Sequence, residues 1–278
     1  MCRLVGWVAS PGLSLCDALE PENLSAFTQL SRIHADGWGM AHAAQDGELA
    51  LRTATTGASL DPEFAALASE VITSAALVHL RWATPGLPVE PRNTHPFRQH
   101  GSAFAHNGGI YPLQRLPEML TPAWRSQLSG TTDSEYYYLA LLTEMRDAGA
   151  DALTAIRRVT AHLAESYTPS SLNAMLLTAD ALYVISCYDP STRPVLPAVE
   201  PGDDLLAAHT SDETYYALRY RRTQGAVVVA SSGFSQPAPQ GWTDLPNNHV
   251  MIIDRATLTL AEYALDLALR PTAGAGPR

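Results

Sequence analysis

Short apolar runs recur along this chain, and they constrain its fold more than any other feature of the sequence. Eight of them combine β-branched and other apolar side chains over four to seven residues, a pattern typical of buried β-strands. Helical patterns occur in groups between the runs and do not alternate with them one by one. This order favours antiparallel sheets with helices laid on them, so we predict an α+β fold. The predicted strands are Leu4–Ala9, Gly39–Ala43, Ala76–Trp82, Ala103–His106, Leu172–Thr178, Leu182–Cys187, Ala226–Ser231 and Val250–Asp254.

Three segments have the period of amphipathic helices. Asp61–Thr73 places its apolar side chains on one face, with Pro62 in the first turn, where a missing N–H is tolerated. Ser134–Ala150 and Asp151–Tyr167 give two consecutive helices, which we expect to pack as a pair.

The length of the chain, 278 residues, suits a single domain with one sizeable core. We expect residues 2–268 to form this domain. Residues 269–278 are rich in proline and glycine and have no apolar period, so we expect them to form a disordered tail.

Charge and cysteine content argue against several classes of function. The formal net charge of −10 disfavours nucleic acid and anionic membranes as partners, and no apolar run is long enough to cross a membrane. The three cysteines form no CxxC pair, and the histidines lack the spacing of a zinc site. We therefore expect a cytoplasmic enzyme with reduced thiols that uses no metal ion and no cofactor.

Cys2 is the first candidate for chemistry. If Met1 is removed, this residue carries a thiol nucleophile together with a free α-amine that could serve as its base. A cysteine here can also be an accident of sequence, and Cys2 alone does not decide between the two interpretations.

Two strand ends carry further polar candidates. Arg81 ends an apolar strand in HLRWATPG, where it either forms a structural ion pair or binds a substrate carboxylate with its guanidinium group. Asn107 and Gly108 end another strand, in AFAHNGGI. Asn-Gly is a favoured hairpin turn, but an Asn amide beside a main-chain N–H can also form an oxyanion hole.

Asp133 lies in GTTDSEYYY, where the segment from Thr132 to Glu135 has the capping-box pattern of a helix start. Its carboxylate either caps this helix or faces a substrate ammonium group, and both interpretations hold if Thr132 supplies the cap. Together, a cation, an anion, an oxyanion hole and a thiol match one ligand, the γ-amide of a glutamyl group.

The order of these stretches resembles the class II glutamine amidotransferases, which are N-terminal-nucleophile hydrolases. The resemblance covers roughly the first half of the chain and rests on six stretches in family order: MCRLVGW, HADGWGMA, HLRWAT, NTHPF, AHNGGI and TTDSE. It implies a four-layer αββα sandwich.

The resemblance also implies roles for individual residues. Cys2 would be the nucleophile, with its own α-amine as general base. Asn107 and Gly108 would hold the oxyanion, and Arg81 and Asp133 would bind the glutamyl head. Three further residues would line or gate the pocket: Trp82, Thr84 and His95.

Two departures from the family pattern point to a subgroup. The chain lacks an Arg-Gly pair before its DGWG segment, and Pro85 stands where some members have histidine. Both features resemble a compact subgroup with an MCR start, which includes ergothioneine-pathway γ-glutamyl hydrolases and the amidotransferase-like subunit of fungal glutathione degradation.

The resemblance implies an amidohydrolase that cleaves glutamine or a γ-glutamyl conjugate through a γ-glutamyl thioester. The chain leaves no room for a domain that would use the ammonia, which favours a stand-alone enzyme. Two alternatives stay open. The chain could be a glutaminase subunit that delivers ammonia to a separate synthetase, or a binding or regulatory protein on a catalytically retired fold.

Overall fold

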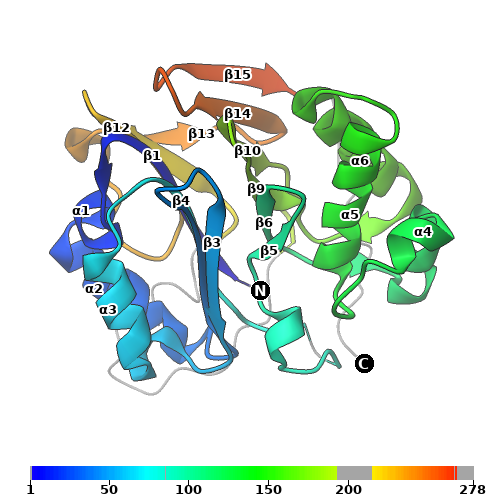
Figure 1. Ribbon diagram of the computed structural model, residues 1–278, viewed down its shortest axis with the longest axis horizontal. Helices are drawn as coiled ribbons and strands as arrows, with labels where there is room; N and C mark the ends of the chain where they lie inside the picture. The colour runs from blue at the N-terminus through cyan, green and yellow to red at the C-terminus, as the bar shows by residue number, and fades with distance from the viewer. Residues whose placement is uncertain (1, 85, 193–214, 266, 268–278) are drawn as a thin grey trace.

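Two antiparallel β-sheets lie at the centre of the molecule, and helices cover the outer face of each (Figure 1). The computed structural model describes residues 2–84, 86–192, 215–265 and 267. The predicted tail at residues 269–278 lies outside these described residues. The order of the layers, helices, sheet, sheet and helices, confirms the predicted α+β class and the αββα sandwich.

The first sheet has seven strands, and β1 is the central one. It pairs with β12 on one side and with β4 on the other, both antiparallel. In order across the sheet the strands are β13 (Trp242–Leu245), β11 (Leu218–Arg222), β12 (Ala226–Ser231), β1 (Arg3–Leu13), β4 (Thr73–Leu80), β2 (Trp38–Ala43) and β3 (Leu49–Ala54).

The second sheet has six strands. In order they are β15 (Leu260–Ala264), β14 (His249–Asp254), β10 (Ala181–Ser186), β9 (Asn173–Leu177), β6 (Ser102–Asn107) and β5 (Phe97–Gln99). Two short strands, β7 (Ile110–Tyr111) and β8 (Thr168–Pro169), pair with each other outside the two sheets.

Each sheet carries its own group of helices. The first sheet packs against α1 (Leu15–Leu19), α2 (Pro21–Gln29) and α3 (Pro62–Glu70), on the left in Figure 1. The second packs against α4 (Pro122–Arg125), α5 (Asp133–Arg146) and α6 (Ala152–Ser166), on the right. Short 3-10 segments are η1 (Leu30–Arg32), η2 (Ala58–Leu60), η3 (Pro91–Asn93), η4 (Leu113–Met119) and η5 (Ala238–Gln240).

Strand β1 shows how one sheet serves two cores. Val5 and Trp7 pack into the core under α1, α2 and α3, whereas Leu4 and Val8 pack into the core between the two sheets. This alternation follows from the period of two in a β-strand. Because both faces of β1 are buried from Arg3 to Ala9, the strand fixes the position of the residue that precedes it, Cys2.

Side-chain caps define where the helices begin. Thr132 accepts a hydrogen bond from Glu135 N and starts α5, and Asp151 accepts one from Thr154 N and starts α6. The two helices share one core with the second sheet, as predicted for a packed pair. No helix in the described part of the chain is both long and apolar enough to cross a membrane.

Candidate active site

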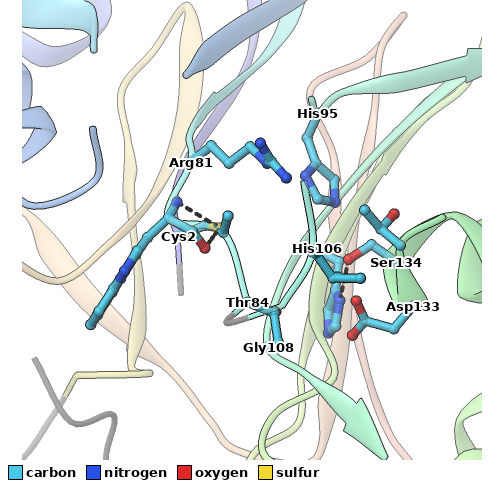
Figure 2. Close-up of a pocket in the computed structure, with 12 residues that line it drawn as sticks. Cys2, Arg81, Thr84, His95, His106, Gly108, Asp133 and Ser134 are labelled. Atoms are coloured by element: carbon cyan, nitrogen blue, oxygen red, sulfur yellow. Dashed lines mark hydrogen bonds between the residues drawn. The ribbon is translucent and has the colours of Figure 1, made fainter. Parts of the chain in front are cut away.

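A pocket lies at one end of the sandwich, where the start of β1 meets the ends of β4 and β6 (Figure 2). In the β1–β4 ladder Arg3 pairs with Leu80, so Cys2 lies beside the residues that follow β4. The pocket is lined by Cys2, Arg81, Trp82, Ala83, Thr84, Leu87, His95, His106, Gly108, Thr132, Asp133 and Ser134.

The structure brings the predicted site residues together although they are far apart in sequence. Asn107 is the one that does not line the pocket, and it contacts Cys2 directly. The others form the pocket wall: Cys2, Arg81, Trp82, Thr84, His95, Gly108 and Asp133.

Cys2 is held by main-chain and amide groups on two sides. Its nitrogen donates a hydrogen bond to Asn107 Oδ1 at 2.8 Å. Its Sγ lies 3.4 Å from the main-chain nitrogen of Trp82, which donates to the sulfur, and 3.6 Å from the Trp82 carbonyl oxygen. These contacts hold the thiol of Cys2 against the segment that follows β4.

Asn107 and Gly108 do not form a hairpin turn. Strand β6, which ends at Asn107, pairs with β5 and β9, whereas the next strand, β7, pairs with β8. Asn107 is fully buried, and within the described chain no group accepts a hydrogen bond from its Nδ2. A buried donor without a partner lowers the stability of the folded protein. It is available to donate a hydrogen bond to a ligand oxygen.

Gly108 owes its identity to close packing. A Cβ atom at this position would lie 2.0 Å from the carbonyl oxygen of Ser171 and 2.7 Å from His106 Nε2. Any side chain would therefore push the chain away from these neighbours.

Arg81 is 2% exposed, and within the described residues its guanidinium donates hydrogen bonds to main-chain oxygens. Its Nη1 lies 3.4 Å from the Asp36 carbonyl oxygen, and its Nη2 donates to the Pro88 carbonyl at 3.1 Å. No carboxylate among the described residues forms an ion pair with it. Burial lowers the pKa of Arg81, so its charge lacks full compensation within the protein.

Asp133 is equally buried, at the first position of α5. Thr132 supplies the helix cap, so the carboxylate of Asp133 is free to serve another purpose. Its Oδ2 accepts a hydrogen bond from Ile110 N at 2.9 Å. Burial raises the pKa of Asp133, and the neighbouring His106 and main-chain N–H groups oppose that rise. Figure 2 shows Arg81 and Asp133 on opposite sides of the pocket.

Two buried histidines, His95 and His106, line the pocket, and a third, His79, packs behind His95. The rings of His79 and His95 lie 4.3 Å apart, and their ring nitrogens have no partner within the described residues. His106 lies 2.9 Å from Ser171 O and 2.9 Å from Ser134 Oγ. Since a carbonyl only accepts, His106 carries its proton on Nε2 and accepts from Ser134 at Nδ1. Burial is the main cause that lowers the pKa of all three.

His106 and Ser134 were not among the predicted site residues. His106 directly precedes Asn107, and a titratable residue at that point of a buried strand was the available signal. Ser134 lies in the TTDSE stretch, but no local pattern joins it to His106, because the contact arises from the packing of α5 against β6. Among the described residues no group of three or more His, Cys, Asp or Glu could hold a metal ion.

Residues 1–197 match the class II glutamine amidotransferases, and the chain belongs to this family. A probable glutamine amidotransferase of Saccharomyces cerevisiae is 25% identical over 258 residues, which cover 82% of this chain and 72% of the relative. The γ-glutamyl-hercynylcysteine sulfoxide hydrolase of Mycolicibacterium smegmatis is 26% identical over 263 residues, covering 90% and 95%.

Solved structures give the same fold. A glutamine aminotransferase class-II domain protein from Silicibacter pomeroyi superimposes with a TM-score of 0.64 at 19% identity, over 95% of this chain and 99% of that protein. This likeness confirms the predicted four-layer αββα fold.

Proposed function

We propose that this protein is a cysteine-dependent amidohydrolase that cleaves the γ-glutamyl amide bond of glutamine or of a γ-glutamyl conjugate. The observation that carries the proposal is the set of groups around one pocket: a thiol, a buried cation and a buried anion, with an unpartnered amide donor beside the thiol. A γ-glutamyl group offers a partner to each of them. The similarity to the γ-glutamyl-hercynylcysteine sulfoxide hydrolase of Mycolicibacterium smegmatis supports a γ-glutamyl conjugate as substrate.

The two charged groups would bind the head of the substrate. The α-carboxylate would accept from the guanidinium of Arg81, and the α-ammonium would donate to Asp133. Arg81 is buried, where its charge acts on the carboxylate with less screening than a surface charge would. Trp82, Thr84 and His95 would complete the wall around the glutamyl chain.

Removal of Met1 would turn the nitrogen of Cys2 into a free α-amine. This nitrogen already contacts Asn107 Oδ1, so the amide would orient it. The amine would take the proton of the thiol through a water molecule, and the thiolate would attack the γ-carbonyl carbon.

The carbonyl oxygen would then become an oxyanion, held by Asn107 Nδ2 and the main-chain N–H of Gly108. The protonated α-amine of Cys2 would give its proton to the leaving amine or ammonia. A γ-glutamyl thioester on Cys2 would remain. Water, deprotonated by the same α-amine, would attack the thioester. Glutamate would leave, and the thiol of Cys2 would be restored.

Glutamate release tests this proposal. We expect protein that begins at Cys2 to release glutamate from glutamine or from γ-glutamyl conjugates, and we expect Cys2→Ala to release none because the nucleophile is lost. Mass spectrometry of the N-terminus should accompany the assay. Equal release by both proteins would contradict the proposal.

A glutaminase subunit that feeds ammonia to a synthetase is the second candidate role. Glutamine turnover stimulated by such a partner would favour it, and cleavage of conjugates but not of glutamine by the isolated protein would count against it. A retired binding protein is disfavoured, because the thiol, the amide and both charged groups are all present.

We also propose that residues 2–268 form one catalytic domain and that it works in the cytoplasm, which the three free cysteines support.

A further inference from the structure

We propose that Asn93 is a positioning residue that sets the separation of Arg81 and Asp133, and through it the selectivity of the pocket for a glutamyl head. Asn93 does not line the pocket. The inference rests on the function proposed above, because it assigns those two residues to the carboxylate and the ammonium of one substrate.

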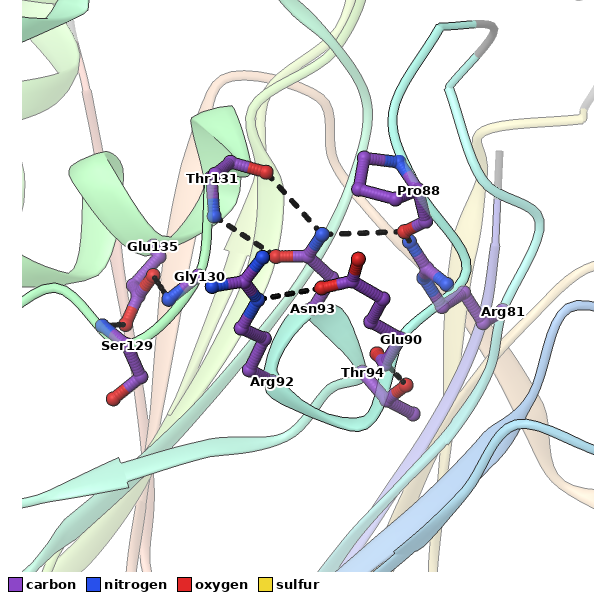
Figure 3. Close-up of polar contacts among 10 residues, drawn as sticks. All are labelled: Arg81, Pro88, Glu90, Arg92, Asn93, Thr94, Ser129, Gly130, Thr131 and Glu135. Carbon is purple, nitrogen blue, oxygen red and sulfur yellow. Dashed lines mark hydrogen bonds and ion pairs between the residues drawn. The ribbon is translucent and has the colours of Figure 1, made fainter.

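The amide of Asn93 is fully buried and connects two separate loops (Figure 3). Its Nδ2 donates to the Pro88 carbonyl at 3.2 Å and to Thr131 Oγ1 at 3.3 Å. Its Oδ1 accepts from Thr131 N at 2.8 Å. The bond to Pro88 lies within the connection between β4 and β5, and the two bonds to Thr131 join this connection to the loop before α5.

The first of these loops contacts the cation. The Pro88 carbonyl oxygen that accepts from Asn93 also accepts from Arg81 Nη2, at 3.1 Å. Leu87, the residue before it, lines the pocket and donates from its main-chain N to the Thr84 carbonyl at 3.0 Å. Loss of the Asn93 contact would release Pro88, and with it one of the two oxygens that hold the guanidinium.

The second loop carries the anion. Thr131 precedes the helix cap and Asp133. The loop is fixed from its other side by Glu135, whose carboxylate accepts from Ser129 N at 2.7 Å and Gly130 N at 2.8 Å. A Cβ atom at Gly130 would lie only 2.2 Å from Asn93 Oδ1, so the loop approaches the amide as closely as glycine permits.

These contacts form a continuous chain of hydrogen bonds from Arg81 through Pro88 and Asn93 to Thr131, two residues before Asp133. The carboxylate and the ammonium of a glutamyl group are attached to the same carbon atom, so they can engage both charged groups only at one separation. A misplacement of about 1 Å at a remote contact can cost about a hundredfold in rate. Asn93 would thus act on the substrate through the spacing of its two binding groups.

Substrate analogues distinguish this role from a purely structural one. The probes are glutamine, glutaramate, which lacks the α-ammonium, and 4-aminobutanamide, which lacks the α-carboxylate. For Asn93→Ala we expect kcat/KM for glutamine to fall about 10- to 100-fold. We expect a much smaller fall for the two analogues, because neither can use both charged groups at once.

Asn247→Ala is a matched control. The amide of Asn247 also bridges separate segments, since it donates to the Tyr188 carbonyl at 2.8 Å and accepts from Tyr188 N at 3.0 Å, but it does not line the pocket. We expect this variant to keep the preference of the unsubstituted protein for glutamine over both analogues. If Asn93→Ala keeps that preference too, the proposal is wrong.

Two further comparisons keep the test decisive. If Asn93→Ala shows no cooperative melting, Asn93→Asp removes the Nδ2 donors to Pro88 and Thr131 Oγ1 and keeps an oxygen that can accept from Thr131 N. A reduced preference in this variant supports the proposal, and an unchanged one overturns it. Failure of the proposed function would look different. The unsubstituted protein would then release no glutamate from glutamine or from γ-glutamyl-p-nitroanilide.

Discussion

The two sheets contribute different kinds of groups to the pocket and hold them by different means. On the side of the first sheet, Cys2 and Arg81 adjoin the ends of β1 and β4, and the register of two central strands places them. On the other side, Asn107 and Asp133 lie where β6 ends and α5 begins, and hydrogen bonds from individual main-chain nitrogens, Cys2 N and Ile110 N, orient their side chains. Register follows from the hydrophobic pattern of whole strands, so the first side is set by many residues and the second by few.

Substitution of Asn107 should have the largest effect of the changes that test this comparison. We expect Asn107→Ala to lower kcat about 10²- to 10³-fold, as is usual when one oxyanion donor is lost. KM should change little, because the donor acts on charge that develops only in the transition state. Steady-state kinetics with a γ-glutamyl substrate would measure both.

Asn107→Asp separates the two functions of this side chain. A carboxylate keeps an oxygen that can accept from the nitrogen of Cys2 but removes the Nδ2 donor. We expect no recovery of kcat relative to Asn107→Ala. Recovery would show that the side chain only holds the N-terminal residue and contributes nothing to an oxyanion.

Arg81→Lys should have a smaller effect, and mainly on KM. A lysine ammonium keeps the positive charge but cannot reproduce the planar guanidinium fork. A lost charge-assisted hydrogen bond of about 1.5–3 kcal/mol corresponds to a rise in KM of about 10- to 100-fold. An unchanged KM would mean that Arg81 holds the Pro88 loop and does not bind substrate.

The buried histidines should give the smallest effect, on stability. Burial lowers the pKa of His79, so the unfolded chain takes up this proton at higher pH than the folded protein does. Stability from this group is therefore present above about pH 6.5 and is lost as the pH falls below it. When the pH is lowered from about 7.5 to about 5.5, we expect the Tm of His79→Leu to fall by less than the Tm of the unsubstituted protein.

His162→Gln serves as the control for this prediction, because His162 is exposed on α6. Its Tm should depend on pH in the same way as that of the unsubstituted protein. If the Tm of His79→Leu falls on acidification as much as that of the unsubstituted protein, groups other than His79 cause the fall. The prediction would then be wrong.

The interior strands could be predicted from the sequence, and the edge strands could not. All eight predicted strands lie inside the two sheets, where both faces are covered and the sequence reads as a continuous apolar run. Unpredicted strands include all four edges, β13, β3, β15 and β5. Their exposed faces carry polar residues that dilute the pattern. The interior strand β11 was missed because three of its five residues are arginines.

Prediction of the candidate site from the sequence was also incomplete, for a different reason. Cys2, Arg81, Asn107 and Asp133 could be predicted because each belongs to a stretch of sequence with a chemical pattern of its own. Asn93 lies in such a stretch, NTHPF, but its contacts are to Pro88 and to Thr131, which no local pattern joins to it. A residue that works by connecting two loops becomes visible only in the folded chain.

Mass spectrometry of acid-quenched protein gives the most direct test of the central claim, that the sulfur and the nitrogen of Cys2 act together on a γ-glutamyl group. After brief mixing with a γ-glutamyl substrate, we predict a glutamyl adduct on a peptide that begins at Cys2. Adduct on Cys16 or Cys187, or full turnover by protein that retains Met1, would contradict the account.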